Sequence, residues 1–270
     1  MTNNKESKLL ISGEAGSMTV ARSFDLNADL GEGCANDAAL LAIVTSANIA
    51  CGAHAGDADT MRRTVDEAIA NNVAIGAHPG YADRENFGRR RIPMTEAQIE
   101  DLIGTQTITL VEIARGAGAR VTYVKPHGAL ANVAAEDAGV ADAIARATQR
   151  VDPSLALLAM PGSQLEAAAH RQGVAVVREL YADRGYTEAG MLVSRSLPGA
   201  LIDDEEAAVA RLRNYMRTGR MTTASGNSIV LPADSICVHG DTPHAVGVAR
   251  QLRAMLQDEG CEVRSFSLRI

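Results

Sequence analysis

Short apolar runs alternate with longer segments of helical period along most of this chain. The apolar runs are candidate strands, and seven stand out: Ser23–Asp29, Ala47–Cys51, Val73–Ala77, Val121–Lys125, Leu155–Met160, Val174–Leu180 and Ile236–His239. An eighth candidate covers Glu262–Phe266. Strands that alternate with helices are typical of repeated βα units, so the pattern predicts an α/β protein with a parallel sheet.

The segments between these runs have the length and end signals of helices. The predicted helices are Ala58–Asn71, Thr95–Gly116, Asp137–Arg150, Asp203–Thr218 and Thr242–Glu259. Gly116 or Gly118 closes the second of them, as glycine often does at a helix C-terminus.

One connection, from Tyr181 to Pro232, is far longer than a usual βα loop. It contains one of the predicted helices and a predicted hairpin that turns at Ser225–Asn227. Long excursions on α/β folds usually lie over the site or at a subunit contact. Because no linker interrupts the pattern, we expect a flexible N-terminal tail over 1–22 and a single β/α barrel domain over 23–270.

Composition narrows the class of protein. The chain has 270 residues, with 26 Lys and Arg against 33 Asp and Glu, and a net charge of −7. An acidic chain without a basic stripe disfavours nucleic-acid binding, and the absence of Trp disfavours base stacking. The four cysteines form no C-x-x-C pair, and neither a signal peptide nor an apolar run long enough to span a membrane is present. We therefore expect a cytoplasmic protein with reduced thiols and no membrane association.

Two nearly identical pentapeptides contain the first chemical signal. "GAHAG" at Gly52–Gly56 and "GAHPG" at Gly76–Gly80 begin 24 residues apart (76 − 52), which is about one strand–helix unit. Four histidines follow the ends of predicted strands in this way, each near a glycine: His54, His78, His127 and His239. The C-terminal ends of parallel strands open on one face, where α/β active sites lie. A single histidine there could simply bond a carbonyl, but four together favour a site. His170, in the last turn of a helix before Gly173, needs only a dipole or capping role.

The first strand carries polar residues on one face. Asp25, Asn27 and Asp29 alternate along "FDLNADLGEG", and such a face is costly in a sealed core unless its groups are paired or metal-bound. We expect them to line a wet cavity. A calcium loop is rejected, because the positions that would need Gly and Glu are Leu30 and Asn36.

Cations and acids follow other strands. Lys125 precedes His127 in "VKPHG" and is a candidate to hold a carboxylate or phosphate, with a snorkelling lysine as the alternative. The repeated tetrapeptide YADR, at Tyr81 and Tyr181, begins two arginine-containing loops that could surround an anion: Arg84, Arg89, Arg90, Arg184 and Arg195. Arginine runs are usually solvated, so only Arg184 and Arg195 are assigned to the ligand.

Further candidates lie at the sixth and seventh strands. Glu179 is a candidate acid or base. "ICVHGDTPHAV" adds Asp241 and His244 to His239, although Asp241 or Thr242 would also serve as a helix N-cap. A Walker phosphate loop, a G-x-S-x-G elbow and H-E-x-x-H are all missing from the sequence.

Six motifs in chain order now resemble one known family. They run from about Phe24 to the C-terminus: "DLNADLGEG", "SANIACGAHAGD", "GAHPGY" with "NFGRR", "KPHGAL", "ADRGY" with "LVSR", and "ICVHGDTPHAV". Together they resemble the LamB/YcsF family, the A subunit of bacterial 5-oxoprolinase. The sequence departs from that pattern at Ala53, where relatives often carry Phe, and at Ala131, where they often carry Tyr.

The resemblance implies a fold, a reaction and partners. The fold would be a seven-stranded parallel β/α barrel, a distorted TIM-like barrel similar to that of polysaccharide deacetylases. The reaction would be ATP-dependent opening of 5-oxo-L-proline to L-glutamate, with ATP as co-substrate and subunits B and C as partners. A homo-oligomer is left open.

The site residues are hypotheses drawn from the positions described above. The catalytic candidates are Asp25, His54, Lys125, His127 and His239. The substrate-binding candidates are Asn27, Asn48, His78, Glu179, Arg184, Arg195 and Asp241. Lys125 with Arg184 or Arg195 would grip the substrate, Asp25, His54 or His127 would orient water, and His239 would protonate the leaving nitrogen.

Two alternatives remain. One is a metal-dependent deacetylase or amide hydrolase that works without ATP, with Asp25, His54 and His127 as ligands. The other is a non-catalytic subunit that regulates the same complex.

Overall fold

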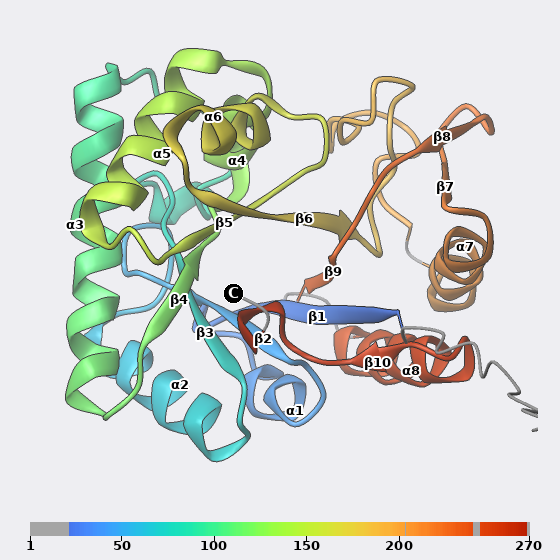
Figure 1. Cartoon of the computed structure of the whole chain (residues 1–270), viewed down its shortest axis with the longest axis horizontal. Coiled ribbons are helices and arrows are strands. Elements are labelled where there is room, and N and C mark those ends of the chain that lie inside the picture. The colour runs from blue at the N-terminus through green and yellow to red at the C-terminus, as the bar shows by residue number, and fades with distance from the viewer. Residues whose placement is uncertain (1–21, 203, 240–243, 269–270) are drawn as a thin grey trace, which may run out of the picture.

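A closed ring of seven parallel strands forms the centre of the molecule (Figure 1). The computed structural model describes residues 22–202, 204–239 and 244–268, so the predicted tail over 1–22 lies almost wholly outside the described residues. The ring strands are β1 (Ser23–Leu30), β2 (Ser46–Ala50), β3 (Ala74–His78), β4 (Val121–Val124), β5 (Ala156–Ala159), β6 (Ala175–Tyr181) and β9 (Ser235–His239). β1 pairs with both β2 and β9, which closes the ring. The predicted seven-stranded parallel β/α barrel is confirmed.

The eighth candidate strand lies outside this ring. β10 (Glu262–Val263) pairs in parallel only with Ser23 and Phe24, at the start of β1. Residues 27–29 of β1 pair with both β2 and β9. β10 therefore adds to the sheet only at the N-terminal end of β1, outside the closed ring.

Helices surround the strands (Figure 1). They are α1 (Asp37–Leu41), α2 (Ala58–Ala70), α3 (Glu96–Gly116), α4 (Gly128–Glu136), α5 (Ala138–Val151), α6 (Gln164–Gln172), α7 (Glu205–Thr218) and α8 (Ala245–Asp258), with single 3-10 turns at Arg84–Asn86 and Phe266–Leu268. Local signals set their ends: Thr95 and Gln98 form a capping box before α3, and α6 ends at Gly173 in the left-handed conformation.

The predicted helices are confirmed to within a few residues, whereas α1 and α4 were not predicted. The predicted starts of two helices, at Asp203 and Thr242, lie outside the described residues, and α7 and α8 begin at Glu205 and Ala245. α4 begins with Gly128, a residue that ordinarily argues against a helix, and its N-cap is His127. This unpredicted helix therefore begins at one of the candidate catalytic residues.

The barrel interior is packed with few aromatic rings. Tyr123 on β4 is fully buried and packs across β3, where a Cβ on Gly76 would lie 2.1 Å from its ring. Glycine at 76 is therefore required by a close approach between neighbouring strands.

The long connection between β6 and β9 contains α7 and an antiparallel hairpin, β7 (Arg220–Thr222) and β8 (Ser228–Val230), as predicted. In Figure 1 these elements lie on the side of the barrel opposite α3. The start of this excursion is fixed by Arg184, which donates from Nε to the carbonyl of Ala200 (3.1 Å) and from Nη2 to that of Val193 (2.8 Å).

The structure also bears on the expectations about thiols and membranes. All four cysteines lie in the described part of the chain and none is in a disulfide. Within 22–202, 204–239 and 244–268, no helix combines the length and apolar character needed to cross a lipid bilayer.

Candidate active site

A cavity of about 410 Å³ opens at the C-terminal ends of the strands. Its polar lining includes most of the predicted mouth residues, namely His78, Lys125, His127, Arg184, Arg195 and His239, together with Asp29, Glu32, Arg89 and Asn132. Groups far apart in the sequence are thus brought to one basin, as expected for a parallel barrel.

The polar face of β1 does not line this cavity along its whole length. Asp25 and Asn27 are 0 % exposed, and only Asp29 reaches the cavity. The expectation of a wet cavity along β1 was wrong. Asp25, Asn27 and Asp29 are instead each hydrogen-bonded or ion-paired, which is the other way in which a buried polar face can be stable.

Asp25 lies at the deep end of this face. Its carboxylate accepts hydrogen bonds from Thr45 (2.7 Å), Ser46 (2.6 Å) and Ser235, which belong to the start of β2 and of β9. Burial raises the pKa of the Asp25 carboxyl to about 6, despite these three hydroxyl donors. Asp25 therefore lies below the cavity, away from the imidazoles that were expected to share a metal with it.

Two asparagines link Asp25's strand to its neighbours. Asn48 donates from Nδ2 to Asn27 Oδ1 (2.7 Å) and to Asp29 Oδ1 (2.8 Å), and its own carbonyl accepts from Tyr123 (2.7 Å). Neither asparagine lines the cavity. Asn48 therefore positions Asp29 from beneath, while Asn27 holds Asn48 and donates to Ser235 (2.8 Å), and the predicted contact of both asparagines with substrate is not supported by their placement.

Lys125 lies between the acids at the cavity floor. Its Nζ is 2.9 Å from Asp29 Oδ1, 2.8 Å from Glu179 Oε1 and 3.0 Å from Cys237 Sγ. Burial opposes the ammonium charge, but Asp29, Cys237 and Glu179 outweigh it and hold the pKa of Lys125 well above its usual range. The ammonium donates hydrogen bonds to Asp29 Oδ1, Cys237 Sγ and, at 3.4 Å, Asn27 Oδ1, whereas Glu179 is an ion-pair partner. Lys125 thus holds the floor together and also lines the cavity, and its role in gripping the substrate stays a prediction.

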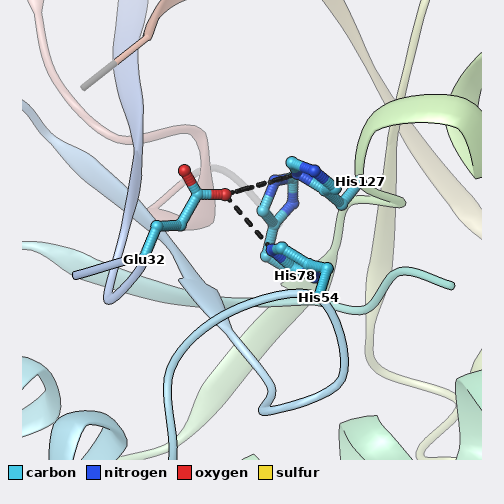
Figure 2. Close-up of side chains that lie close together, drawn as sticks. All are labelled: Glu32, His54, His78 and His127. Carbon is cyan, nitrogen blue, oxygen red and sulfur yellow. Dashed lines mark hydrogen bonds and ion pairs between the residues drawn. The ribbon is translucent and has the colours of Figure 1, made fainter. Parts of the chain in front are cut away.

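Three imidazoles and a carboxylate form one wall of the site (Figure 2). His78 Nδ1 donates to the carbonyl of Lys125 (2.8 Å), and His127 Nε2 donates to the carbonyl of Phe87 (2.8 Å). The remaining nitrogens, His78 Nε2 and His127 Nδ1, are 2.9 Å apart. His54 donates from Nε2 to Glu32 Oε1 (3.2 Å) and is 1 % exposed.

The glycines of the near-repeat make room for this wall. A Cβ on Gly80 would lie 2.8 Å from His54 Nδ1. A Cβ on Gly88, whose φ is +62°, would lie 2.8 Å from the Cβ of His54 and 2.9 Å from the His127 ring. The second pentapeptide therefore ends in glycine because the histidine of the first packs against it.

Glu32 was missed by the sequence analysis, although it lies inside the quoted motif "DLGEG". Gly31 (φ +71°) and Gly33 (φ +85°) flank it in the left-handed conformation, and the chain turns back over the barrel there. Its side chain is 4 % exposed, and Oε1 is 3.3 Å from His127 Nδ1. The usable signal was the one that identified the histidines: a functional group between glycines after a strand.

His239 forms the opposite side of the cavity. Its Nδ1 bonds to Asp183 Oδ2 at 2.7 Å, and its ring stacks on Tyr181 at 5.5 Å. Burial lowers the pKa of His239, but Asp183 more than compensates and raises it above the ordinary value of 6.5. Burial alone would raise the pKa of the Asp183 carboxyl, but His239 outweighs burial and holds that pKa below its ordinary value. The histidine was predicted from the sequence, whereas Asp183, which lies in the loop after β6, was not.

The arginines separate into two groups. Arg89, Arg184 and Arg195 line the cavity, although Arg184 is buried and already bonded to two carbonyls. Arg84 donates to the carbonyls of Gly52 (3.1 Å) and Gly56, so it fixes a loop outside the cavity. Arg195 and the unassigned Arg89 thus join the predicted residues at the cavity lining, and Asp241 lies outside the described residues.

The predicted metal set of Asp25, His54 and His127 does not come together. In the described part of the chain, two groups have ligand atoms within 4.8 Å of one another: Glu32, His54, His78 and His127, and separately Asp29, Cys237 and His239. Asp25 belongs to neither, because it lies near the opposite end of β1.

Comparison with known proteins assigns the chain to a family. The model of the LamB/YcsF family matches residues 24–269. The chain belongs to the LamB/YcsF family. The lactam utilization protein of Thermus thermophilus is 37 % identical, with a TM-score of 0.84 over 90 % of this chain and 100 % of that one.

A more distant structure shares the fold of this LamB/YcsF chain. It is a protein of Enterococcus faecalis whose assignment to cellobiose-phosphate cleavage is provisional. The identity is 12 % and the TM-score 0.55, over 92 % of this chain and 98 % of that one. At this identity the likeness shows the barrel alone.

Proposed function

We propose that this LamB/YcsF protein hydrolyses the amide bond of a small lactam as the A subunit of an ATP-dependent 5-oxoprolinase. Its substrate is then 5-oxo-L-proline and its partners are the B and C subunits. Family membership and the 37 % identical lactam utilization protein support the substrate class. A cavity of about 410 Å³ is of the size that holds a small molecule.

The observation that carries the proposal is the placement of a proton donor and two carboxylates around one cavity. The donor is His239, whose pKa Asp183 raises. Asp29 lies beside His239 on the neighbouring strand, and both line the cavity together with Glu32. Burial opposes the charge of Asp29, but nearby positive charge, including that of Lys125, holds its pKa well below the usual range. Ring opening needs a proton donor for the leaving nitrogen and an acceptor for a proton of the attacking water.

The chemistry explains why ATP is required. A lactam is a resonance-stabilised amide and therefore a poor electrophile. Transfer of the γ-phosphoryl group to the lactam oxygen turns that oxygen into a leaving group and releases ADP. One water then adds to the ring carbon and gives up a proton to Asp29 or Glu32. His239 protonates the nitrogen as the C–N bond breaks. A second water releases phosphate and leaves the open amino acid.

The test is reconstitution. This chain is mixed with B and C subunits, and glutamate and ADP are measured from 5-oxoproline with each component omitted in turn. Glutamate and ADP should appear together only in the complete set, and His239→Gln should lower the rate at least about a hundredfold. His170→Gln, at an exposed histidine of α6, is the matched control and should leave the rate unchanged.

Two outcomes overturn the proposal. If the rate without this chain equals that of the complete set, the chain is at most regulatory. If the complete set forms no glutamate, the substrate is wrong.

ATP-independent amide hydrolysis is a second candidate, favoured by the convergence of Glu32, His78 and His127. Turnover by this chain alone, without nucleotide and abolished by a chelator, would identify it.

A further inference from the structure

The geometry points to a metal site: we propose that Glu32, His78 and His127 bind one divalent transition-metal ion of the zinc class at the wall of the cavity. This inference does not depend on the lactam substrate, because it concerns what these three side chains bind.

The tautomers of His78 and His127 are fixed by two backbone carbonyls. A carbonyl only accepts, so the proton of His78 is on Nδ1, toward Lys125, and that of His127 is on Nε2, toward Phe87. In the neutral rings both remaining nitrogens carry lone pairs, and these atoms lie 2.9 Å apart. Two lone pairs at that distance repel each other unless a cation lies between them. The cation is either an extra proton or a metal ion.

The distances among the donor atoms fit a metal ion. Zinc at about 2.0–2.1 Å from nitrogen and oxygen ligands in a tetrahedron separates them by about 3.3 Å. Glu32 Oε1 is 3.3 Å from His127 Nδ1 and 3.9 Å from His78 Nε2, and the two nitrogens are 2.9 Å apart. These values bracket the tetrahedral edge. All three residues line the cavity, so a fourth position would face it, as in catalytic zinc sites.

The surroundings of the ligands are also those of a metal site. Metal-binding histidines usually donate their second N–H to a carbonyl or carboxylate, and both do so here. Asp29 Oδ2, 3.4 Å from His78 Nε2, adds negative charge beside the proposed ion.

His54 has a different part in this site. Its ring is parallel to that of His127, with an interplanar angle of 2° and centroids 3.8 Å apart. Two stacked rings cannot both direct an in-plane lone pair at one ion, so His54 is not a fourth ligand in this arrangement. Its Nε2 instead donates to Glu32 Oε1, which makes it a positioning residue for the carboxylate ligand.

The neighbouring group of Asp29, Cys237 and His239 is not a second metal site. The Lys125 ammonium lies between two of its members, 2.9 Å from Asp29 Oδ1 and 3.0 Å from Cys237 Sγ. A second cation there would meet a buried positive charge.

The experiment measures metal binding by the full-length chain. Protein stripped with a chelator is dialysed against Zn²⁺ or Co²⁺, and bound metal is counted by elemental analysis. We expect one ion per chain, the strong visible absorption of four-coordinate Co²⁺, and a higher unfolding temperature with Zn²⁺.

The variants separate ligands from supports. Glu32→Gln keeps the shape of the side chain and should weaken affinity more than about a hundredfold, as should His78→Ala. His54→Gln should lose about 10- to 100-fold, the usual effect of a residue that orients a ligand. His170→Ala is the matched control and should bind metal as the unaltered chain does.

Two results would overturn the proposal. One is less than about a tenth of an equivalent of metal on the folded, unaltered chain at micromolar Zn²⁺, with a proton shared by His78 and His127 in the nitrogen NMR spectrum. The other is metal uptake that Glu32→Gln and His78→Ala leave unchanged, since the ion would then be bound elsewhere.

Discussion

The imidazole of His54 lies flat against that of His127, with ring centroids 3.8 Å apart. The two residues are 73 positions apart (127 − 54) and come from the loops after β2 and β4. Space for the stacked pair exists only because Gly80 and Gly88, from the loop after β3, present no side chain to it. The site wall is therefore assembled by three successive βα units.

Gly80→Ala should disturb this stack. The new Cβ would lie 2.8 Å from Nδ1 of His54, in a ring that is 1 % exposed and cannot move freely. Overpacking of this kind costs about 1–3 kcal/mol of unfolding free energy, and displacement of His54 should also weaken metal binding. Urea unfolding and Co²⁺ titration measure the two effects.

Gly104→Ala is the control for that substitution. Gly104 lies inside α3, and a Cβ there would have nothing within 4 Å. Alanine should stabilise this helix by about 0.5–1 kcal/mol and leave metal binding unchanged. If Gly80→Ala and Gly104→Ala had the same unfolding free energy and the same Co²⁺ affinity, the stacked histidines would not need the space left by Gly80.

Lys125→Met should destabilise the barrel strongly. The change leaves the carboxylates of Asp29 and Glu179 without their shared cation at the buried floor of the cavity. Removal of one partner from a buried ion pair costs about 3–5 kcal/mol, because the other charge remains uncompensated. Adding Glu179→Gln should restore part of the loss, as measured by urea unfolding.

Arg150→Met provides the comparison for Lys125. The Arg150 side chain is 64 % exposed and pairs with Glu100 on the outer surface. Exposed pairs contribute about 0–1 kcal/mol, so this variant should be nearly neutral. A small effect of Lys125→Met alone would mean that the floor acids do not depend on the ammonium.

Asp25 should make stability fall as pH rises through the weakly acidic range. Burial raises its pKa in the folded state from 3.8 to about 6, so folding disfavours its charged form. The cost is absent below pH 3.8, grows between the two values and is complete above about 6. A shift of about two units corresponds to about 3 kcal/mol.

Asp25→Asn isolates this contribution. The difference in unfolding free energy between the variant and the unaltered chain should change by about 3 kcal/mol between about pH 4 and pH 7, in favour of the variant at the higher pH. A difference that stays constant with pH, or that changes in the opposite direction, would show that Asp25 is not destabilised as a carboxylate.

The sequence predicted the barrel and the histidine-bearing strand ends because both are local features. Period and glycine spacing identify a strand and where it stops, and parallel connectivity brings those ends together. How far a residue lies from the mouth of the barrel cannot be predicted from its neighbours in the sequence. Asp25 and Asp29 share one face of β1, but four residues at about 3.3 Å each place them about 13 Å apart. Alternation alone could not tell the deep residue from the one at the mouth.

The missed residues depended on backbone conformations and loop packing. Glu32 reaches the histidines because two left-handed glycines turn the chain back, and Asp183 reaches His239 across 56 positions (239 − 183) of chain. The partners of Lys125 could not be predicted for a related reason. Its apolar flanks indicated that it was buried, but only the three-dimensional arrangement brings Asp29, Glu179 and Cys237 to its ammonium.

Arg195→Ala and Arg89→Ala should reveal which part of the substrate lies at the cavity rim. Both arginines line the cavity, whereas the Lys125 ammonium is paired with the buried acids Asp29 and Glu179. A charge-assisted hydrogen bond contributes about 1.5–3 kcal/mol, so its loss should raise KM for 5-oxoproline about 10- to 100-fold in the reconstituted system. The same five-membered lactam without its carboxylate should show no such change. Arg90→Ala, an exposed neighbour outside the cavity lining, is the control and should leave both substrates unaffected. Equal losses for the two lactams would place the arginines against the phosphoryl group instead, because that group is common to both reactions.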